Sequence, residues 1–188
     1  TMKQYQSGTY EKTIKQLKQQ GYDPQAIKKL KQITKQRLNA QKDWYAATTR
    51  AGETGGEAYL ESQRYYIPNE FLSKNVPVNN GTAPSGWLDG MAISPDGDEI
   101  VISEYKGGTS RLSSTPRQTI YEGTARQGTP AYTRDRMLSD PRFAQYFHDH
   151  PDVWEGVKSG QTRLTIKVMR TKTPELTRIT EQPFTLTP

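Results

Sequence analysis

Two acidic residues and a lysine fall on one predicted β-hairpin. The segment 87–108 reads as two short strands joined at Asp96-Gly97, because these residue types tolerate the positive φ angles of tight hairpin turns. In a hairpin with its turn at this place, the residue numbers of every facing pair have the same sum. Asp89 therefore faces Glu104. Because side chains alternate along a strand, Lys106 lies on the same face as Glu104.

The same register pairs Ile93 with Ile100 and Met91 with Ile102. This face of the hairpin is therefore an apolar row that ends in two carboxylates and an ammonium group. Two facing anions repel each other and destabilise a sheet. A divalent cation between them would reverse that effect, since hard cations prefer oxygen ligands. The alternative is an ordinary ion pair at the edge of a sheet.

An Asp followed by a strand with Glu-x-Lys resembles the core motif of the PD-(D/E)XK, or restriction-endonuclease-like, nucleases. Here the motif stands as Asp89 and Glu104-Tyr105-Lys106, with Leu88 where the family often has Pro, and the resemblance covers roughly residues 53–140. It implies an α/β (α+β) fold, a mixed central sheet flanked by helices. It also implies hydrolysis of phosphodiester bonds with Mg²⁺ or Mn²⁺, and Zn²⁺ as a further alternative. Asp89, Glu104 and the main-chain carbonyl of Tyr105 would bind the metal, and Lys106 would orient the attacking water.

The resemblance extends the site to two further segments. Members of the superfamily often carry a Glu on the helix before the active-site strands, and the string GEAYL favours Glu57 over Glu61 for that role. The alternative for both is an exposed helix carboxylate. Arg126 and Gln127 precede a Tyr-bearing helix, as in bacterial toxin domains of this superfamily, and are expected to hold the scissile phosphate or the water.

This second likeness implies the toxin domain of a larger secreted bacterial protein. Such a domain would act in the target-cell cytoplasm, be neutralised by a cognate immunity protein, and be a monomer when isolated. We expect a nucleic acid substrate, with DNA favoured over RNA. No apolar run approaches the ~20 residues of a membrane span, and no signal peptide is visible. The absence of Cys excludes disulfides and Cys-ligated zinc.

Positive charge is concentrated at the N-terminus. Residues 1–50 hold 11 Lys and Arg against 3 Asp and Glu, a net charge of +8, whereas the remainder has a net charge of −2. We divide the chain into a basic helical region, 1–50, and a nuclease-like domain, 51–188. Within the first region Lys28, Lys31 and Lys35 are candidates for binding nucleic acid, or form only a solvated helix face.

Periodicity and capping residues predict the other elements. Apolar spacing predicts helices over 9–20 and from Pro24 to about Thr48, and the glycines of 50–56 predict a linker before a helix over 57–66. Segment 109–126 reads as an active-site loop with Ile120-Tyr121 as its packing point. Further helices are expected to start at Pro130, Pro141 and Pro151, and strands over 162–171 and 176–186.

Three functional hypotheses remain open from the sequence. The first is a metal-dependent nuclease. The second is a nucleic-acid-binding module without catalytic activity, in which the Asp89–Glu104 pair is structural. The third is a protein-interaction domain whose basic helices bind an acidic partner.

Overall fold

The computed structural model describes residues 8–77, 84, 86–121, 123–172 and 176–186. Its elements form two compact units, Thr1–Ala47 and Thr48–Pro188. In chain order they are α2 Thr9–Gln19, α3 Pro24–Ser62, the short 3₁₀ helices η1 Asn69–Phe71 and η2 Ser73–Asn75, β1 Gly90–Ile93, β2 Glu99–Gly107, β3 Arg117–Gln118, β4 Thr124–Ala125, α4 Pro130–Ser139, α5 Pro141–Asp149, α6 Pro151–Ser159, β5 Arg163–Thr171 and β6 Leu176–Phe184.

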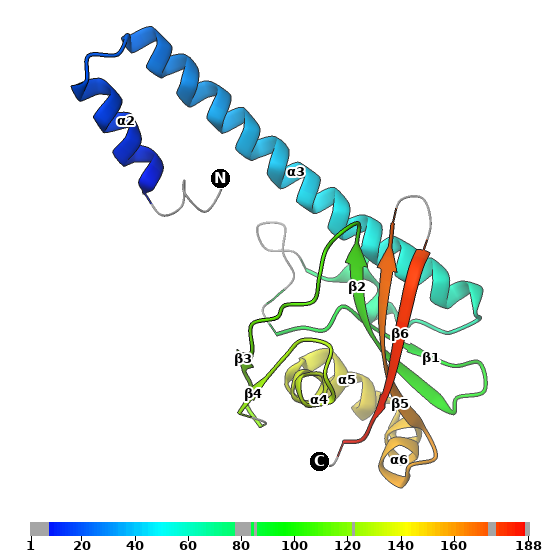
Figure 1. The fold of residues 1–188 in the computed structure, drawn as a ribbon. Coiled ribbons are helices and arrows are strands. Elements are labelled where there is room, and N and C mark those ends of the chain that lie inside the picture. Colours follow the sequence, from blue (N-terminus) through cyan, green and yellow to red (C-terminus); the bar gives the residue numbers. More distant parts are fainter. Residues whose placement is uncertain (1–7, 78–83, 85, 122, 173–175, 187–188) are drawn as a thin grey trace. The chain divides into compact units, whose positions relative to one another are not determined.

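The second unit is built on a mixed four-stranded sheet in the order β1-β2-β5-β6 (Figure 1). Strands β1 and β2 are antiparallel in the predicted register, with Met91 opposite Ile102 and Ile93 opposite Ile100. Strand β5 runs parallel to β2, so the chain must cross over between them, and α4, α5 and α6 form that crossover. The predicted α/β class with a mixed sheet flanked by helices is confirmed.

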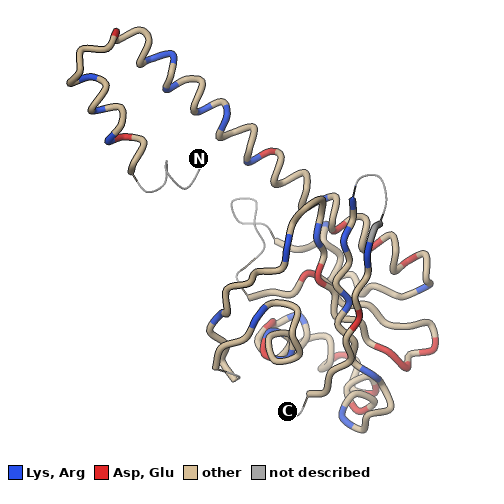
Figure 2. Tube along the Cα trace, in the orientation of Figure 1, with Lys and Arg blue, Asp and Glu red and all other residues tan. Residues whose placement is uncertain are grey.

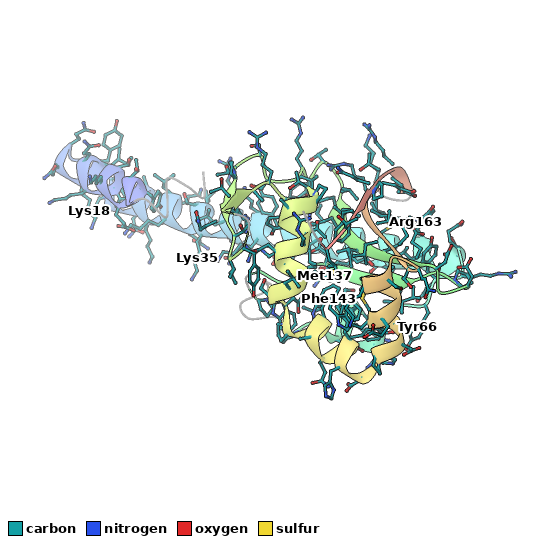
Figure 3. All side chains as sticks on the ribbon, turned by 90° about the horizontal axis from the view of Figure 1, so that it is seen from below. Lys18, Lys35, Tyr66, Met137, Phe143 and Arg163 are labelled. Atoms are coloured by element: carbon teal, nitrogen blue, oxygen red, sulfur yellow. The ribbon has the colours of Figure 1, made fainter. Side chains whose placement is uncertain are left out.

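Helices cover both faces of the sheet. The ring of Tyr105 in β2 lies against Gly56 of α3. The preceding residue, Glu104, points to the opposite face, where it meets Gln127 just before α4. Helix α3 therefore covers one face of the sheet and α4 the other. Figure 3 labels Met137 of α4 and Phe143 of α5, and both side chains are buried in the core on the α4 side.

The predicted linker over residues 50–56 is wrong, because α3 runs unbroken through it to Ser62. The glycines of this segment allow α3 to pack closely on the sheet. A Cβ atom on Gly56 would lie 2.2 Å from the Tyr105 ring, and one on Gly55 would lie 2.3 Å from the Thr171 hydroxyl. Glycine is favoured here because the helix backbone approaches the sheet too closely for any side chain.

The remaining predicted elements are largely found. Thr129 caps α4 through its side-chain oxygen, which accepts from the N–H of Tyr132, and Pro130 takes the first helical position. Strands β5 and β6 match the two predicted C-terminal strands. The prediction for Ile120-Tyr121 is wrong: both side chains are exposed at the tip of a small hairpin formed by β3 and β4.

The first unit contains α2 and the N-terminal part of α3. Ile14 and Ile27 are its buried apolar residues, and Asp23 caps the start of α3 by accepting from the N–H groups of Gln25 and Ala26. Basic residues lie along both helices (Figure 2). Among the described helices, none combines the length and the apolar character that a membrane span requires.

We expect Gly56→Ala to lower the free energy of unfolding by about 1–3 kcal/mol, because the new methyl group overpacks the Tyr105 ring. Helix propensity alone predicts the opposite sign, a gain of about 1 kcal/mol. Urea unfolding followed by circular dichroism measures the difference, with Thr49→Ala, an exposed position of the same helix, as the control. A more stable Gly56→Ala protein would contradict close packing of α3 on the sheet.

Candidate active site

Asp89, Glu104 and Lys106 meet at the end of the β1–β2 hairpin. The Lys106 Nζ atom lies 3.0 Å from Glu104 Oε2 and 3.4 Å from Asp89 Oδ2. The Glu104 side chain is only 3% exposed, whereas Asp89 is 34% exposed. The structure thus brings together the three residues that the spacing predicts, with Asp89 on the solvent side of the group.

The pairing of β1 with β2 ends just before Asp89 is reached, at Gly90. The N–H of Tyr105 donates to Asp89 Oδ2 at 2.8 Å, and Leu88, which would continue the ladder opposite Tyr105, donates its own N–H to Asp140. In an antiparallel strand the N–H and C=O of one residue point to the same side. The Tyr105 carbonyl therefore faces the Asp89 edge, as its predicted role as a metal ligand requires.

A buried ion pair fixes the segment that carries Asp89. Arg142 donates to Asp140 at 2.6 Å and to the carbonyl of Leu88, also at 2.6 Å. Its guanidinium lies 4.4 Å from the centre of the Trp87 ring. Breaking such a buried pair leaves an uncompensated charge and is costly. Asp140 and Arg142 therefore hold the backbone of Leu88 and the ring of Trp87, and so position Asp89.

The charge of Asp89 affects the protonation of Glu104. Burial, then the nearby charge of Asp89, raises the pKa of Glu104 to about 8, although Lys106 acts in the opposite direction. Burial alone would lower the pKa of Lys106, but Asp89 and Glu104 outweigh it and the pKa is raised. Lys106 is thus a charged ammonium at neutral pH, while Glu104 holds a proton unless another cation replaces it.

Gln127 joins the group from the other side. Its amide nitrogen donates to Glu104 Oε2 at 2.8 Å, and its amide oxygen accepts from the N–H of Ser113 at 3.1 Å. The same Glu104 oxygen therefore receives hydrogen bonds from Lys106 and Gln127. Arg126, the preceding residue, is exposed. Gln127 thus contacts the carboxylate group directly, while the expected contact of Arg126 and Gln127 with a phosphate or a water stays a prediction.

Two carboxylates of α3, Glu53 and Glu57, lie on the side of the sheet that Tyr105 faces, and each has its own surroundings. Glu57 Oε1 accepts from the N–H of Ser73 at 2.6 Å, and Glu61 is exposed. Glu53 lies one turn earlier in α3; burial and then the charge of Asp89 raise its pKa. The sequence analysis missed Glu53 because its glycine neighbours predict a linker. The signal was the spacing of four residues between Glu53 and Glu57, which places both on one helix face.

Two side chains of α4 line the α4 side of the site. Tyr132 is buried, and burial and the charge of Glu104 raise the pKa of its hydroxyl. The Arg136 guanidinium lies 5.2 Å from the centre of the Tyr132 ring and donates to the carbonyl of Gln118 at 3.1 Å. A permanent positive charge is thus held beside the Tyr132 ring, and Tyr132 lies within electrostatic reach of Glu104.

The donor set suits a hard divalent cation. Among the described residues, no three Asp, Glu, His or Cys side chains converge closely enough to bind one ion. A metal would therefore be held by the Asp89 and Glu104 carboxylates, the Tyr105 carbonyl and water, a set of oxygen ligands that Mg²⁺ and Mn²⁺ accept. Burial and the charge of Asp89 together outweigh the effect of Lys106 and raise the pKa of Glu104.

Lys28, Lys31 and Lys35 are exposed on the N-terminal part of α3, in the first unit. Figure 2 shows the basic residues that follow this helix. They remain candidates for binding a polyanion.

No protein-family model, no curated protein and no solved structure matches this chain. The site therefore has to be judged on its own geometry.

The stability of the metal-free protein should depend on pH through Glu104. Its pKa is about 8 in the folded chain against an ordinary value of 4.5, so the folded state binds this proton more tightly. That stabilisation is fully present below about pH 4.5 and is lost as the pH rises through about 8. In EDTA, we expect the Tm of Glu104→Gln to fall less than that of the wild type between pH 6 and pH 9.

Thermal unfolding followed by circular dichroism measures this difference. Glu61→Gln, at an exposed position, is the matched control and should behave as the wild type. Adding Mg²⁺ should raise the Tm of the wild type at pH 9 and leave Glu104→Gln nearly unchanged. Equal pH dependence in the wild type and Glu104→Gln would show that Glu104 titrates normally.

Proposed function

We propose that this chain is a metal-dependent nuclease that hydrolyses phosphodiester bonds at the Asp89–Glu104–Lys106 site. The observation that carries the proposal is the burial of Glu104 directly beside Asp89, with one ammonium shared between them. A plain surface ion pair would be exposed and would leave the pKa of its carboxylate low. Here the pKa of Glu104 is raised to about 8, which is typical of a functional site.

Each group has a chemical part in this proposal. A bound divalent cation would supply Lewis-acid activation of the phosphoryl oxygen and lower the pKa of a bound water. Lys106 stays charged, so it stabilises developing negative charge and does not act as a base. Gln127 holds Glu104 in place from the α4 side, and Arg136 offers positive charge to the phosphate.

We propose DNA as the substrate, ahead of RNA, and a general affinity for the phosphate backbone. The exposed lysines of α3 would supply contacts that do not depend on base sequence and that weaken as salt is added. We further propose that the chain is the toxin domain of a larger secreted bacterial protein, with a cognate immunity protein. The support for this last step is the resemblance of residues 126–132 to such toxins, together with the contact of Gln127 with Glu104.

Substitutions at the two carboxylates should abolish cleavage. Asp89→Asn and Glu104→Gln keep the size of each side chain, and Asn can still accept the hydrogen bond from Tyr105. We expect a fall of at least about 100-fold in the rate of plasmid nicking with Mg²⁺, as for loss of one electrostatic group in an active site. EDTA should abolish nicking by the wild type. Nicking by either variant at the wild-type rate would rule out this site.

Lys106→Met should also abolish cleavage, but without loss of the metal ligands. Metal binding followed by isothermal titration calorimetry should therefore survive in Lys106→Met and be weakened in Asp89→Asn. Equal metal affinity in the two variants would remove the distinction between ligand and charge-stabilising roles.

Glu53→Gln and Glu57→Gln form a matched pair on one helix. Because Glu53 lies within electrostatic reach of Asp89 and Lys106, we expect its variant to cleave more slowly at limiting Mg²⁺. Glu57→Gln weakens the hydrogen bond to Ser73 and should lower the Tm with little effect on cleavage. The reverse pattern would assign the helix carboxylate of the site to Glu57.

A further inference from the structure

The β3–β4 hairpin carries two exposed apolar side chains at its tip. Ile120 is 68% exposed and Tyr121 is 63% exposed. Leu138, also exposed, lies on α4 one turn beyond Asp135, the residue that holds the tip. Two consecutive exposed apolar side chains at one hairpin tip make this hairpin a candidate interaction surface.

A buried carboxylate holds this tip in shape. Asp135 is fully buried, and its Oδ1 atom accepts from the N–H of Ile120 at 2.6 Å and from the N–H of Tyr121 at 2.9 Å. Its Oδ2 atom lies 3.7 Å from the Arg136 Nε atom. Burying a carboxylate is costly unless it is hydrogen-bonded. A buried carboxylate thus fixes the backbone of two residues whose side chains point to solvent.

The hairpin is next to the candidate active site. Strand β4 ends at Ala125, two residues before Gln127, whose amide donates to Glu104. Arg136 donates to Gln118 of β3 and stacks on the Tyr132 ring. The path along the chain from Tyr121 to Gln127 covers at most about 20 Å. A nucleic acid strand of several nucleotides bound at the tip is therefore long enough to extend to the carboxylates.

The positive charge around the hairpin indicates which class of ligand would bind at its tip. The arginines at positions 111, 117 and 126 are exposed, and Arg136 lies between the hairpin and the site. A surface that combines arginines with an exposed tyrosine ring suits a nucleic acid strand, whose phosphates meet the arginines and whose bases stack on the ring. Bases inside a duplex are already stacked on each other. The Tyr121 ring is therefore suited to stack on an unpaired base.

We propose that Ile120 and Tyr121 form a base-stacking surface that receives an unpaired nucleotide of the substrate beside the active site. The inference rests on the proposed nuclease function and specifies its substrate as a strand with an unpaired segment. A protein partner on the same tip is the competing occupant, and the experiment below distinguishes the two.

The test measures binding apart from cleavage. The full chain carrying Glu104→Gln, in EDTA, is titrated into a fluorescein-labelled single strand of 20 nucleotides and into the duplex of the same sequence, with fluorescence anisotropy as the readout. Adding Tyr121→Ala should weaken binding to the single strand by about tenfold, or about 1.4 kcal/mol. Binding to the duplex should change by less than about twofold, and Tyr121→Trp should retain the single-strand affinity.

Tyr66→Ala is the matched control, because Tyr66 is 62% exposed and lies opposite Ile93, at the other end of β1 from Asp89 (Figure 3). It should leave both affinities unchanged. If Tyr121→Ala binds the single strand as its parent does, or if it loses no more than Tyr66→Ala, the proposal is overturned and a protein partner becomes the occupant of the tip. If the parent binds neither nucleic acid, the proposed nuclease function fails as well.

Discussion

The repulsion between two facing carboxylates is the constraint on which the rest of the second unit depends. Asp89 and Glu104 lie opposite each other at the end of the β1–β2 hairpin, and Glu104 is buried. One ammonium, Lys106, touches both, yet the pKa of Glu104 stays near 8. The pair needs either a proton or a further cation, so the structure keeps a destabilising feature that a core of apolar residues would avoid.

The neighbouring elements are arranged to hold this pair. The Asp140–Arg142 ion pair fixes the backbone before Asp89, and Gln127 fixes Glu104 from the start of α4. On the other face of the sheet, α3 packs so closely that only glycine fits at residues 55 and 56. That close approach is what brings Glu53, on the same helix, within electrostatic reach of Asp89. A stabilising interaction in each layer thus offsets the electrostatic repulsion at the site.

Positive charge and exposed apolar groups meet on the side of the site that α4 and the β3–β4 hairpin form. Arg136 connects the two by stacking on Tyr132 and donating to Gln118. Asp135, its neighbour, holds the hairpin tip through two main-chain N–H groups. Two consecutive residues of α4 therefore hold the hairpin, one at its tip and the other at β3. Under the proposed function, the hairpin would guide a substrate strand towards the carboxylates.

Local sequence patterns predicted the local elements correctly: the β1–β2 register followed from the Asp96-Gly97 turn, and α4 followed from Thr129-Pro130. Alternation along the hairpin was enough to place Asp89, Glu104 and Lys106 together. The surroundings of other residues come from distant segments, so their roles depend on the folded chain. Glycines that predict a linker became a helix because the sheet lies against them, and Glu53 came within electrostatic reach of Asp89. Ile120 and Tyr121 turned to solvent because Asp135, on another element, binds their backbone. Local patterns report what neighbours in the chain favour, whereas burial and long-range hydrogen bonds depend on residues that only folding brings together.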